Sequence, residues 1–460
     1  MIKVRNLGMK KEKEIVKLSD HFTYGRLLRF TYPSIVMLVF TSIYGVVDGF
    51  FVSNFTGKTP FAAVNFIYPF LMMLGCIGFM FGTGGAALIS LTMGVGRRER
   101  ANELFSLIVY VSAACGVVLA VFGFLFLRPI ASLMGAEGAF LENSIVYGRI
   151  ILMAIPFFIL QYEFQCLFAA AEKPKLGLYV TIAAGVTNIV LDALFVALFQ
   201  WGLEGAAAAT ALSQFVGGTI PLIYFGRKNS SLLRLTKCTM DVRALLKVCA
   251  NGSSELASNI SMSLVNMLYN VQLMKYVGEE GVAAYGVLMY VCLIFQAVFL
   301  GYSVGSAPIT GYHYGAGNYG ELRGLLHKSM NLIGIFSVMM FAAGEILAAP
   351  LSKLFVGYDD GMLQITVRAF CIFSVSFLLS GFSIFGSSFF TALNDGMTSA
   401  LISFMRTFLF QCLAIFVLPV FWGLDGIWVS TAAAEAMAVI VTGMFLFGKR
   451  KKYQYGKLTG

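Results

Sequence analysis

Long apolar runs divide the sequence, and residues 31–55 (TYPSIVMLVFTSIYGVVDGFFVSNF) form the first of them. At a rise of about 1.5 Å per residue, a helix of this length crosses a hydrocarbon layer of roughly 30 Å. Its one carboxylate, Asp48, costs about 2.5 kcal/mol or more inside a membrane, so it requires a cavity, a cation or a partner. The run therefore predicts a transmembrane helix and marks Asp48 as a candidate functional residue.

Composition extends this prediction to the whole chain. Apolar residues make up 58% of the 460 residues and charged residues 12%, against roughly 25% charged in soluble domains. The apolar runs are unbroken and rich in Gly, whereas barrel strands would alternate with period two over about ten residues. We therefore expect an all-α membrane protein. Its twelve predicted spans are residues 27–52, 62–90, 104–127, 143–170, 177–199, 205–225, 248–274, 282–310, 329–349, 363–391, 399–420 and 426–447.

Positive charge is distributed unevenly between the two sides of this predicted bundle. The segments assigned to the inner side carry 26 Lys and Arg residues, and the outer loops carry only Lys58, Arg128, Lys275 and Lys353. The positive-inside rule therefore predicts that both termini are cytoplasmic, as an even number of spans requires. The basic N-terminus has no apolar signal-peptide core, so we expect a multi-pass protein of the cell (inner) membrane. This asymmetry accounts for the net charge of +10, and no nucleic-acid partner is expected.

The second half of the sequence repeats the first at an offset of 221 residues. Residues 198–213 (LFQWGLEGAAAATALS) match residues 419–434 (PVFWGLDGIWVSTAAA). The same offset pairs the inner-loop segment MGVGRRERANELF with YGAGNYGELRGLL, and Pro129 with Pro350. Agreement at three separate places indicates a duplicated six-helix unit.

Because each copy has six spans, both copies start from the same side of the membrane and the repeat is parallel. In transporters of this kind the substrate site lies between the halves near mid-membrane, and rocking of the halves gives alternating access. We therefore predict two pseudo-symmetric six-helix bundles. The predicted parts are a basic cytoplasmic tail (1–24), an N-terminal lobe (25–226), a basic cytoplasmic linker (227–247), a C-terminal lobe (248–448) and a second basic tail (449–460).

Four polar residues of the first lobe are predicted to meet at one depth. Counting inward at about 1.5 Å per residue, Asp48 lies about 8 Å, Asp192 about 10 Å and Thr210 about 8 Å from the outer helix ends. Asn188 precedes Asp192 by four residues and shares its helix face. Their oxygens suit a small cation, and two carboxylates in one apolar pocket also suit a proton. We expect a coupling site for Na⁺ or H⁺ here, with Asp48 and Asp192 also available to a cationic substrate; the alternative is a hydrogen-bonded structural cluster.

Glu255 is the corresponding acidic candidate in the second lobe, about 10 Å into its first span. The position equivalent to Asp48 holds Tyr269 instead of an acid, which suggests that the lobes have different tasks. We assign Glu255 to substrate binding, with an interhelical hydrogen bond as the alternative. Arg406 and Glu435 lie at similar depth on the last two spans, where a structural ion pair is the favoured interpretation.

Several classes of chemistry lack their sequence signals. The eight cysteines are scattered and have no CxxC spacing, so neither a disulfide framework nor a metal framework is predicted. The Gly-rich stretch 81–96 contains no GxxxxGK[ST] motif, which argues against ATP hydrolysis by a phosphate loop. No cofactor is expected beyond the coupling ion.

Taken together, the motifs resemble those of the multidrug and toxic compound extrusion (MATE) family over residues 25–448. The first span ends in VVDGFFVS and is followed by FAAVNFIYPF, and the inner loop carries LISLTMGVGRRERANELF. The fifth span contains TNIVLDALF, and WGLEGAAAATALS has its echo in WGLDGIWVSTAAA. Their order and spacing carry the resemblance more than any one motif does.

This resemblance implies an antiporter that expels organic, often cationic, compounds in exchange for Na⁺ or H⁺. The family's first-lobe cation site would correspond to Asp48, Asn188, Asp192 and Thr210, and Glu255 would match an acidic residue of span seven. One departure is that the tenth span, ITVRAFCIFSVSFLLSGFSIFGSSFFTAL, has no acidic residue where some members carry an aspartate. The first-lobe site therefore gains weight. Small organic compounds and membrane lipids are the expected partners, and a monomer is the expected state.

Two other functions remain open. A flippase for lipid-linked oligosaccharide would need a more cationic central cavity, whereas Arg406 has a plausible acidic partner in Glu435. A membrane-embedded enzyme is weakened because His21, His313 and His327 are the only histidines, one in the N-terminal tail and two near one inner loop. We therefore expect a transporter and not an enzyme.

Overall fold

The computed structural model describes residues 16–357 and 360–456, and every regular element within them is a helix. The all-α prediction is confirmed. The predicted tails fall partly on residues 1–15 and 457–460, outside the described residues. The elements are α1 (Tyr24–Phe55), α2 (Lys58–Gly75), α3 (Ile77–Gly94), α4 (Arg98–Leu133), α5 (Gly138–Ala170), α6 (Pro174–Asp192), η1 (Ala193–Leu198), α7 (Gly202–Gly226), α8 (Val242–Tyr276), α9 (Glu279–Gly315), α10 (Tyr319–Val356), α11 (Asp360–Ser374), α12 (Phe377–Ala392), α13 (Gly396–Phe404), η2 (Met405–Leu409) and α14 (Phe410–Lys449).

Twelve membrane passes follow from these helices. Nine helical stretches of the described chain are long and apolar enough to cross a membrane, and the bent pair α11–α12 makes a tenth. The stretch Gly396–Lys449 counts as one of the nine but contains two passes, because Gly423 has φ 54° and interrupts the helix. Arg406 contacts Glu435 across this break, which shows that the chain turns back on itself. The more polar, 35-residue α8 is the twelfth pass.

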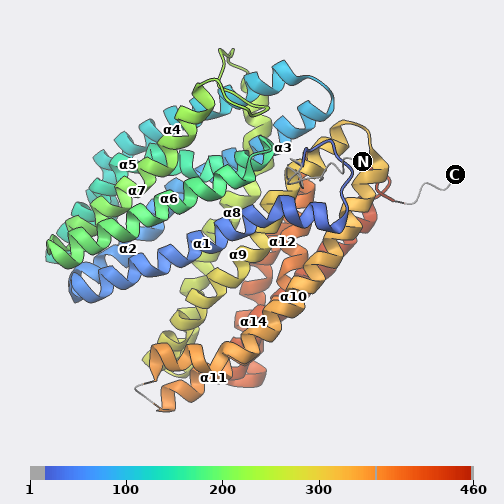
Figure 1. Cartoon of the computed structure of the whole chain (residues 1–460). Helices are drawn as coiled ribbons and strands as arrows, with labels where there is room; N and C mark the ends of the chain where they lie inside the picture. The colour runs from blue at the N-terminus through green and yellow to red at the C-terminus, as the bar shows by residue number, and fades with distance from the viewer. Residues whose placement is uncertain (1–15, 358–359, 457–460) are drawn as a thin grey trace, which may run out of the picture.

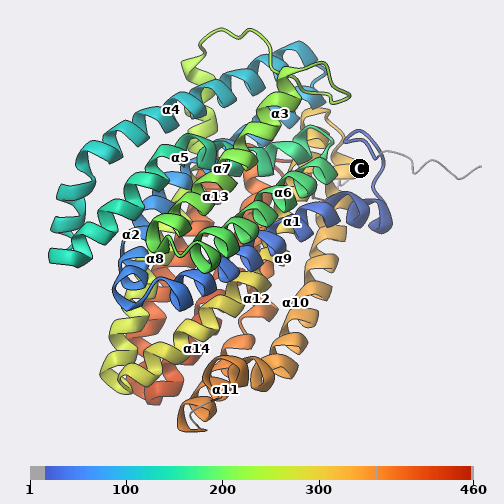
Figure 2. The ribbon, with the colours of Figure 1, turned by 60° about the vertical axis from the view of Figure 1, so that its left-hand side comes forward.

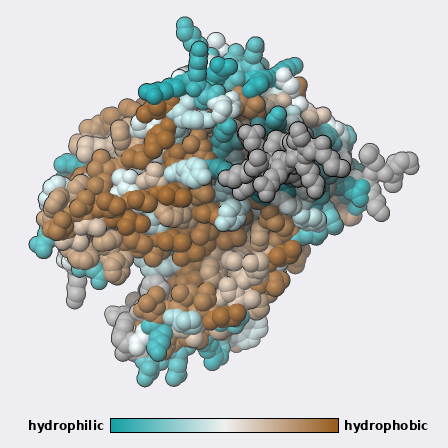
Figure 3. Space-filling view, viewed as in Figure 1, coloured by the Kyte–Doolittle hydropathy of each residue, from teal (hydrophilic) through white to brown (hydrophobic). Residues whose placement is uncertain are grey.

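The passes form two lobes arranged as a V (Figure 1). Helices α1–α7 form the first lobe and α8–α14 the second, and the arrangement persists in the rotated view of Figure 2. Both described chain ends lie where the lobes meet, which we call the terminal end. At the opposite, distal end the lobes diverge, and the space-filling surface is notched between them (Figure 3). The broad apolar surface in that view is the one expected of a chain embedded in lipid.

The lobes meet in the terminal half through direct backbone contact. Helix α3 packs against α5 of its own lobe and against α8 and α9 of the other. A Cβ atom added to Gly84 would lie 2.1 Å from the carbonyl oxygen of Val248, and one added to Gly252 would lie 1.9 Å from that of Met80. These glycines allow α3 and α8 to approach more closely than any side chain would permit.

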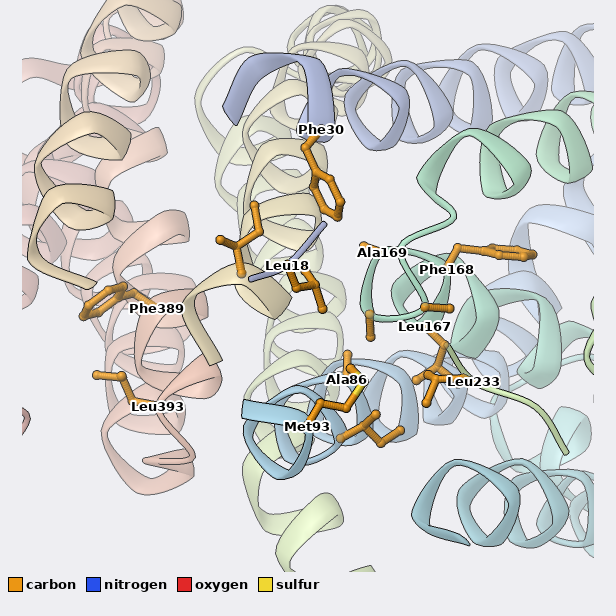
Figure 4. Close-up of a cluster of buried hydrophobic side chains, with 14 of the residues drawn as sticks. Leu18, Phe30, Ala86, Met93, Leu167, Phe168, Ala169, Leu233, Phe389 and Leu393 are labelled. Carbon is orange, nitrogen blue, oxygen red and sulfur yellow. The ribbon is translucent and has the colours of Figure 1, made fainter. Parts of the chain in front are cut away.

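A strap before α1 crosses the terminal end and contacts both lobes. The backbone N–H of Leu18 donates to Glu172 of the first lobe (2.6 Å), and that of Phe22 donates to Glu321 of the second (2.8 Å). Leu18 and Phe22 are fully buried. They belong to an apolar cluster whose side chains come from both lobes, part of which is shown in Figure 4. The strap therefore adds contacts that hold the terminal end closed.

The residues after α14 dock on the terminal end of the second lobe. Tyr453 donates a hydrogen bond to Asp395 (2.7 Å), and the Lys449 ammonium lies 2.6 Å from the same carboxylate. The Tyr453 ring packs edge-on against Phe390, with centroids 6.4 Å apart. Burial raises the pKa of Asp395, but hydrogen bonds from Lys449, Tyr453 and Thr398 outweigh it and hold the pKa at about 2.

This docking is expected to be independent of pH across the physiological range. Because the pKa of Asp395 is held below its ordinary value of 3.8, its contribution is present above about pH 4 and is lost only as pH falls through about 2. In Asp395→Asn, we expect amide hydrogen exchange of residues 450–456 to rise about tenfold at both pH 5 and pH 8. Equal exchange in the variant and the parent, after correction for intrinsic rates, would show that this carboxylate does not hold the tail.

Candidate functional site

The first lobe encloses a cavity of about 330 Å³ between α1, α2, α5, α6 and α7. Tyr290 and Leu293 of α9 line its border with the second lobe. Asp48, Asn188 and Thr210 project into it from α1, α6 and α7. Three of the four polar residues that were predicted to lie at one depth therefore line one cavity. This cavity extends to the border between the lobes.

Asp48 is the acceptor on which the neighbouring polar side chains converge. The Nδ2 atom of Asn188 donates to the Oδ1 atom of Asp48 at 3.4 Å, and the hydroxyl of Thr210 donates to the same Asp48 oxygen at 3.1 Å. Asp48 is half-buried and lines the cavity, so small ions can reach it. Helix α1 and the pair α6 and α7, which are far from it in sequence, thus present oxygen-bearing groups to one point.

Asp192 stands behind this group and is fully buried. Its carboxyl is close enough to that of Asp48 for the two to interact electrostatically. Yet neither Asp192 oxygen, nor the side-chain oxygen of Asn188, has a hydrogen-bond partner among the described residues. Buried oxygens without donors carry a desolvation penalty that a bound cation or proton would remove. Asp192 is also the last residue of α6 before η1, which is a short π-helix. Short π-helical segments are frequent at functional sites.

The structure therefore brings Asp48, Asn188, Asp192 and Thr210 together, as the depth estimate anticipated. The donor set consists of two carboxylates, an amide oxygen and a hydroxyl, which are hard ligands suited to Na⁺ or to a shared proton. Among the described residues, no cluster of three or more His, Cys, Asp or Glu side chains that could hold a metal ion occurs.

Glu255 does not join this group. It lines a separate cavity of about 120 Å³ between the lobes, together with Asn259 of α8, Thr83 of α3 and Ser303 of α9. Walls from both lobes enclose this cavity in the terminal half of the V. Any change in the angle between the lobes would alter its shape, so Glu255 is placed to respond to that motion.

The second lobe holds a neutral counterpart of the Asp48 cluster. Tyr269, which the repeat aligns with Asp48, donates a hydrogen bond to the Oε1 atom of Gln411 at 2.9 Å. Its hydroxyl also lies 2.9 Å from that of Thr431, the repeat partner of Thr210. The nearby Arg406 and Glu435 form the predicted buried ion pair, with a shortest N···O distance of 2.9 Å. In the second lobe the Tyr269 phenol therefore takes the place that the Asp48 carboxylate has in the first. It forms hydrogen bonds directly with the neighbouring side chains of Gln411 and Thr431.

Sequence reasoning could not identify which aromatic residues line the first cavity. Tyr44, Tyr68, Tyr147, Tyr162 and Phe158 face the same space as Asp48. Aromatic faces beside a carboxylate suit an amphipathic organic cation. No sequence signal separates these tyrosines from the many aromatic residues that face lipid, because the distinction depends on how each helix is rotated.

Glu163 was also missed, since its position near a predicted span end gave it no role. The structure buries it completely within the first lobe, where the hydroxyl of Ser112 donates to it. It lines neither cavity. The first lobe thus contains a buried carboxyl group outside the two candidate binding spaces.

Comparison of the sequence with protein-family models identifies both the internal repeat and the family. The sequence profile of the MatE family matches twice, over residues 33–194 and 256–417. The two matched segments correspond to the two lobes and confirm the predicted internal duplication.

Curated relatives cover almost the whole chain at low identity. The multidrug export protein MepA of Staphylococcus haemolyticus (strain JCSC1435) is 24% identical over 452 residues, which span 97% of this chain and 98% of the relative. MepA of Staphylococcus aureus (strain NCTC 8325 / PS 47) is 21% identical over 441 residues, spanning 95% and 96%.

Solved structures share the fold. One is described as an outward-facing conformation of a multidrug resistance MATE family transporter of the MOP superfamily, with TM-score 0.89 and 20% identity. Another, a MOP superfamily transporter from Pyrococcus furiosus described as having a binding pocket of reverse polarity, has TM-score 0.87 and 22% identity. Each alignment covers 95% of this chain and 98% of the other. At this identity the likeness shows the fold alone.

Proposed function

The chain belongs to the MatE family of multidrug and toxic compound extrusion transporters, and we propose that it exports organic, often cationic, compounds in exchange for Na⁺ or H⁺. The relatives named as multidrug export proteins support export as the activity. The antiport mechanism rests on the polar cluster of the first lobe.

One observation carries the proposal: Asp192 is fully buried beside the cavity-lining Asp48, and neither of its carboxylate oxygens has a hydrogen-bond donor among the described residues. A Na⁺ ion between the two carboxylates would use these oxygens together with those of Asn188 and Thr210. A proton on either carboxyl would relieve the repulsion between them. Either ion supplies a positive charge, and none of the described residues that line this cavity is Lys or Arg.

Substrate would occupy the same first-lobe cavity from its open side. The aromatic walls accept a flat or apolar cation, and Asp48 supplies the opposite charge. A cationic substrate and the coupling ion would then compete for Asp48, which makes their binding mutually exclusive. We propose that Glu255 contacts substrate in the second cavity, between the lobes.

Transport would require the coupling ion to bind the two orientations of the V with different affinity, because equal affinity shifts no equilibrium. The conformation described here is closed at the terminal end and open at the distal end. From the Lys and Arg distribution we propose that the terminal end is cytoplasmic, in a bacterial-type inner membrane. This conformation is then the outward-facing one.

Dye efflux from proteoliposomes tests the proposal, with a Na⁺ gradient or a pH gradient imposed alone. We expect one of the two gradients to drive export of a fluorescent organic cation well above the leak of protein-free vesicles. Collapse of that gradient with the matching ionophore should return efflux to the leak. If neither gradient drives export while ATP does, the chain is not an ion-coupled antiporter.

A further inference from the structure

A groove on the outer surface of the first lobe lies outside both cavities. It runs between the start of α1 and the start of α6, close to the terminal end. Its walls are Leu28, Arg29, Tyr32 and Pro33 of α1 and Lys175 of α6. None of these residues lines the cavity of Asp48 or that of Glu255, so the groove has no part in the transport site described above.

Within the part of the chain that the structure describes, the two cations of this groove have no acidic partner. Arg29 and Lys175 are exposed and form no ion pair or hydrogen bond within residues 16–357 and 360–456. The acids close by in sequence are engaged elsewhere: Glu172 accepts the N–H of Leu18, and Asp20 accepts that of Lys17. By contrast, Arg100 and Arg128 are paired with carboxylates.

Apolar side chains continue from this basic end toward the middle of the membrane. On α6, Tyr179, Val186 and Val190 are 65%, 48% and 49% exposed, and their spacing puts them on one helix face. On α1, Tyr32 and Ile43 are 63% and 42% exposed, also on one face. The front of the molecule over α1 and α6 is largely apolar in Figure 3, viewed as in Figure 1. Two apolar strips thus lead away from Arg29 and Lys175, which pair with no other described residue.

We propose that this α1–α6 groove binds an acidic phospholipid. The phosphate lies between the Arg29 guanidinium and the Lys175 ammonium, with the Tyr32 hydroxyl as a further donor. The acyl chains lie along the exposed strips of α1 and α6. Charge complementarity at one end and apolar surface at the other select a lipid over free phosphate, which would gain nothing from the strips.

The site also lies against Pro33, the one proline inside α1. Helix α1 packs on α6 of its own lobe and on α9 of the other, so its first turns link the lobes. A lipid anchored to both α1 and α6 fastens these turns to the first lobe. The inference does not depend on which ion or which compound the chain transports.

Native mass spectrometry of the detergent-purified full chain tests this inference. The parent is titrated with phosphatidylglycerol and, separately, with phosphatidylcholine of the same acyl chains. We expect the parent to retain phosphatidylglycerol in clear preference. In the double variant Arg29→Gln and Lys175→Gln, phosphatidylglycerol affinity should fall about thirtyfold, since each cation contributes about fivefold.

The matched control is Arg97→Gln with Arg98→Gln, which removes two exposed charges from the same end of the molecule. It should keep the lipid preference, and millimolar inorganic phosphate should not displace the lipid. Equal retention of the two lipids by the parent would overturn the proposal. So would equal loss in the two double variants, or displacement by phosphate, which would identify a simple anion site. Ion-driven dye efflux, measured in parallel, tests the transport proposal independently.

Discussion

Asp48→Asn is expected to reduce ion-driven efflux roughly a hundredfold or more. Two unit charges about 4 Å apart attract with about 4 kcal/mol at an effective dielectric constant near 20, and the amide removes that attraction. The fold should survive, because the amide oxygen can still accept from Asn188 and Thr210. The measurement is gradient-driven export of a fluorescent organic cation from proteoliposomes at matched protein density.

The matched control for this experiment is Asp425→Asn, which removes an exposed carboxylate paired with Arg368 at 2.5 Å. It should transport like the parent. Asp192→Asn should resemble Asp48→Asn if the two carboxylates share one ion. Normal ion-driven export in both Asp48→Asn and Asp192→Asn would show that the coupling site lies elsewhere, and Glu163 and Glu255 would become the next candidates.

Gly252→Val is expected to prevent closure of the terminal end and to reduce export at least tenfold. A Cβ atom at this position would lie 1.9 Å from the carbonyl oxygen of Met80, and backbone cannot move aside as a side chain can. Overpacking of this kind costs about 1–3 kcal/mol or more. This is enough to invert an equilibrium between the orientation that is open at the distal end and the one that is open at the terminal end. The variant should therefore favour the orientation in which the terminal end is open.

Spin labels at Arg98 and Arg323, both exposed and in different lobes, report this closure when attached in a cysteine-free background. The distance between them should lengthen in Gly252→Val. Gly443→Val is the control, because a Cβ atom at Gly443 of α14 would meet nothing within 4 Å. Unchanged distances together with normal export in Gly252→Val would mean that the contact between α3 and α8 does not gate the terminal end.

The membrane fold and the Asp48 cluster could be predicted because both depend on position along a helix axis. Span ends are set by the thickness of the bilayer, so Asp48, Asp192 and Thr210 could be placed at one level by counting residues. The rotation of a helix about its own axis has no comparable reference in the sequence. Tyr44 and Tyr147 face the cavity and Val118 is exposed, although all three stand in similarly apolar runs.

The contacts between the lobes also could not be predicted from the sequence. Glu255 was expected about 10 Å into its first span, but only packing places it between the lobes and away from Asp48. The strap formed by Leu18 and Phe22 lies in a polar segment with no helical periodicity, so nothing in its pattern indicates that it crosses both halves. The close approach of Gly84 and Gly252 requires two helices to meet at those residues, which one chain's periodicity does not specify.

The phenol of Tyr269 has a consequence for how this transporter can evolve. With that position filled and hydrogen-bonded to Gln411 and Thr431, the second lobe presents a neutral phenol where the first presents the Asp48 carboxylate. If the first lobe holds the coupling ion, as proposed, substitutions around Tyr269 would leave that ion site intact. On the proposed mechanism, new exported compounds would be acquired through substitutions that leave the four residues of the proposed ion site, Asp48, Asn188, Asp192 and Thr210, unchanged.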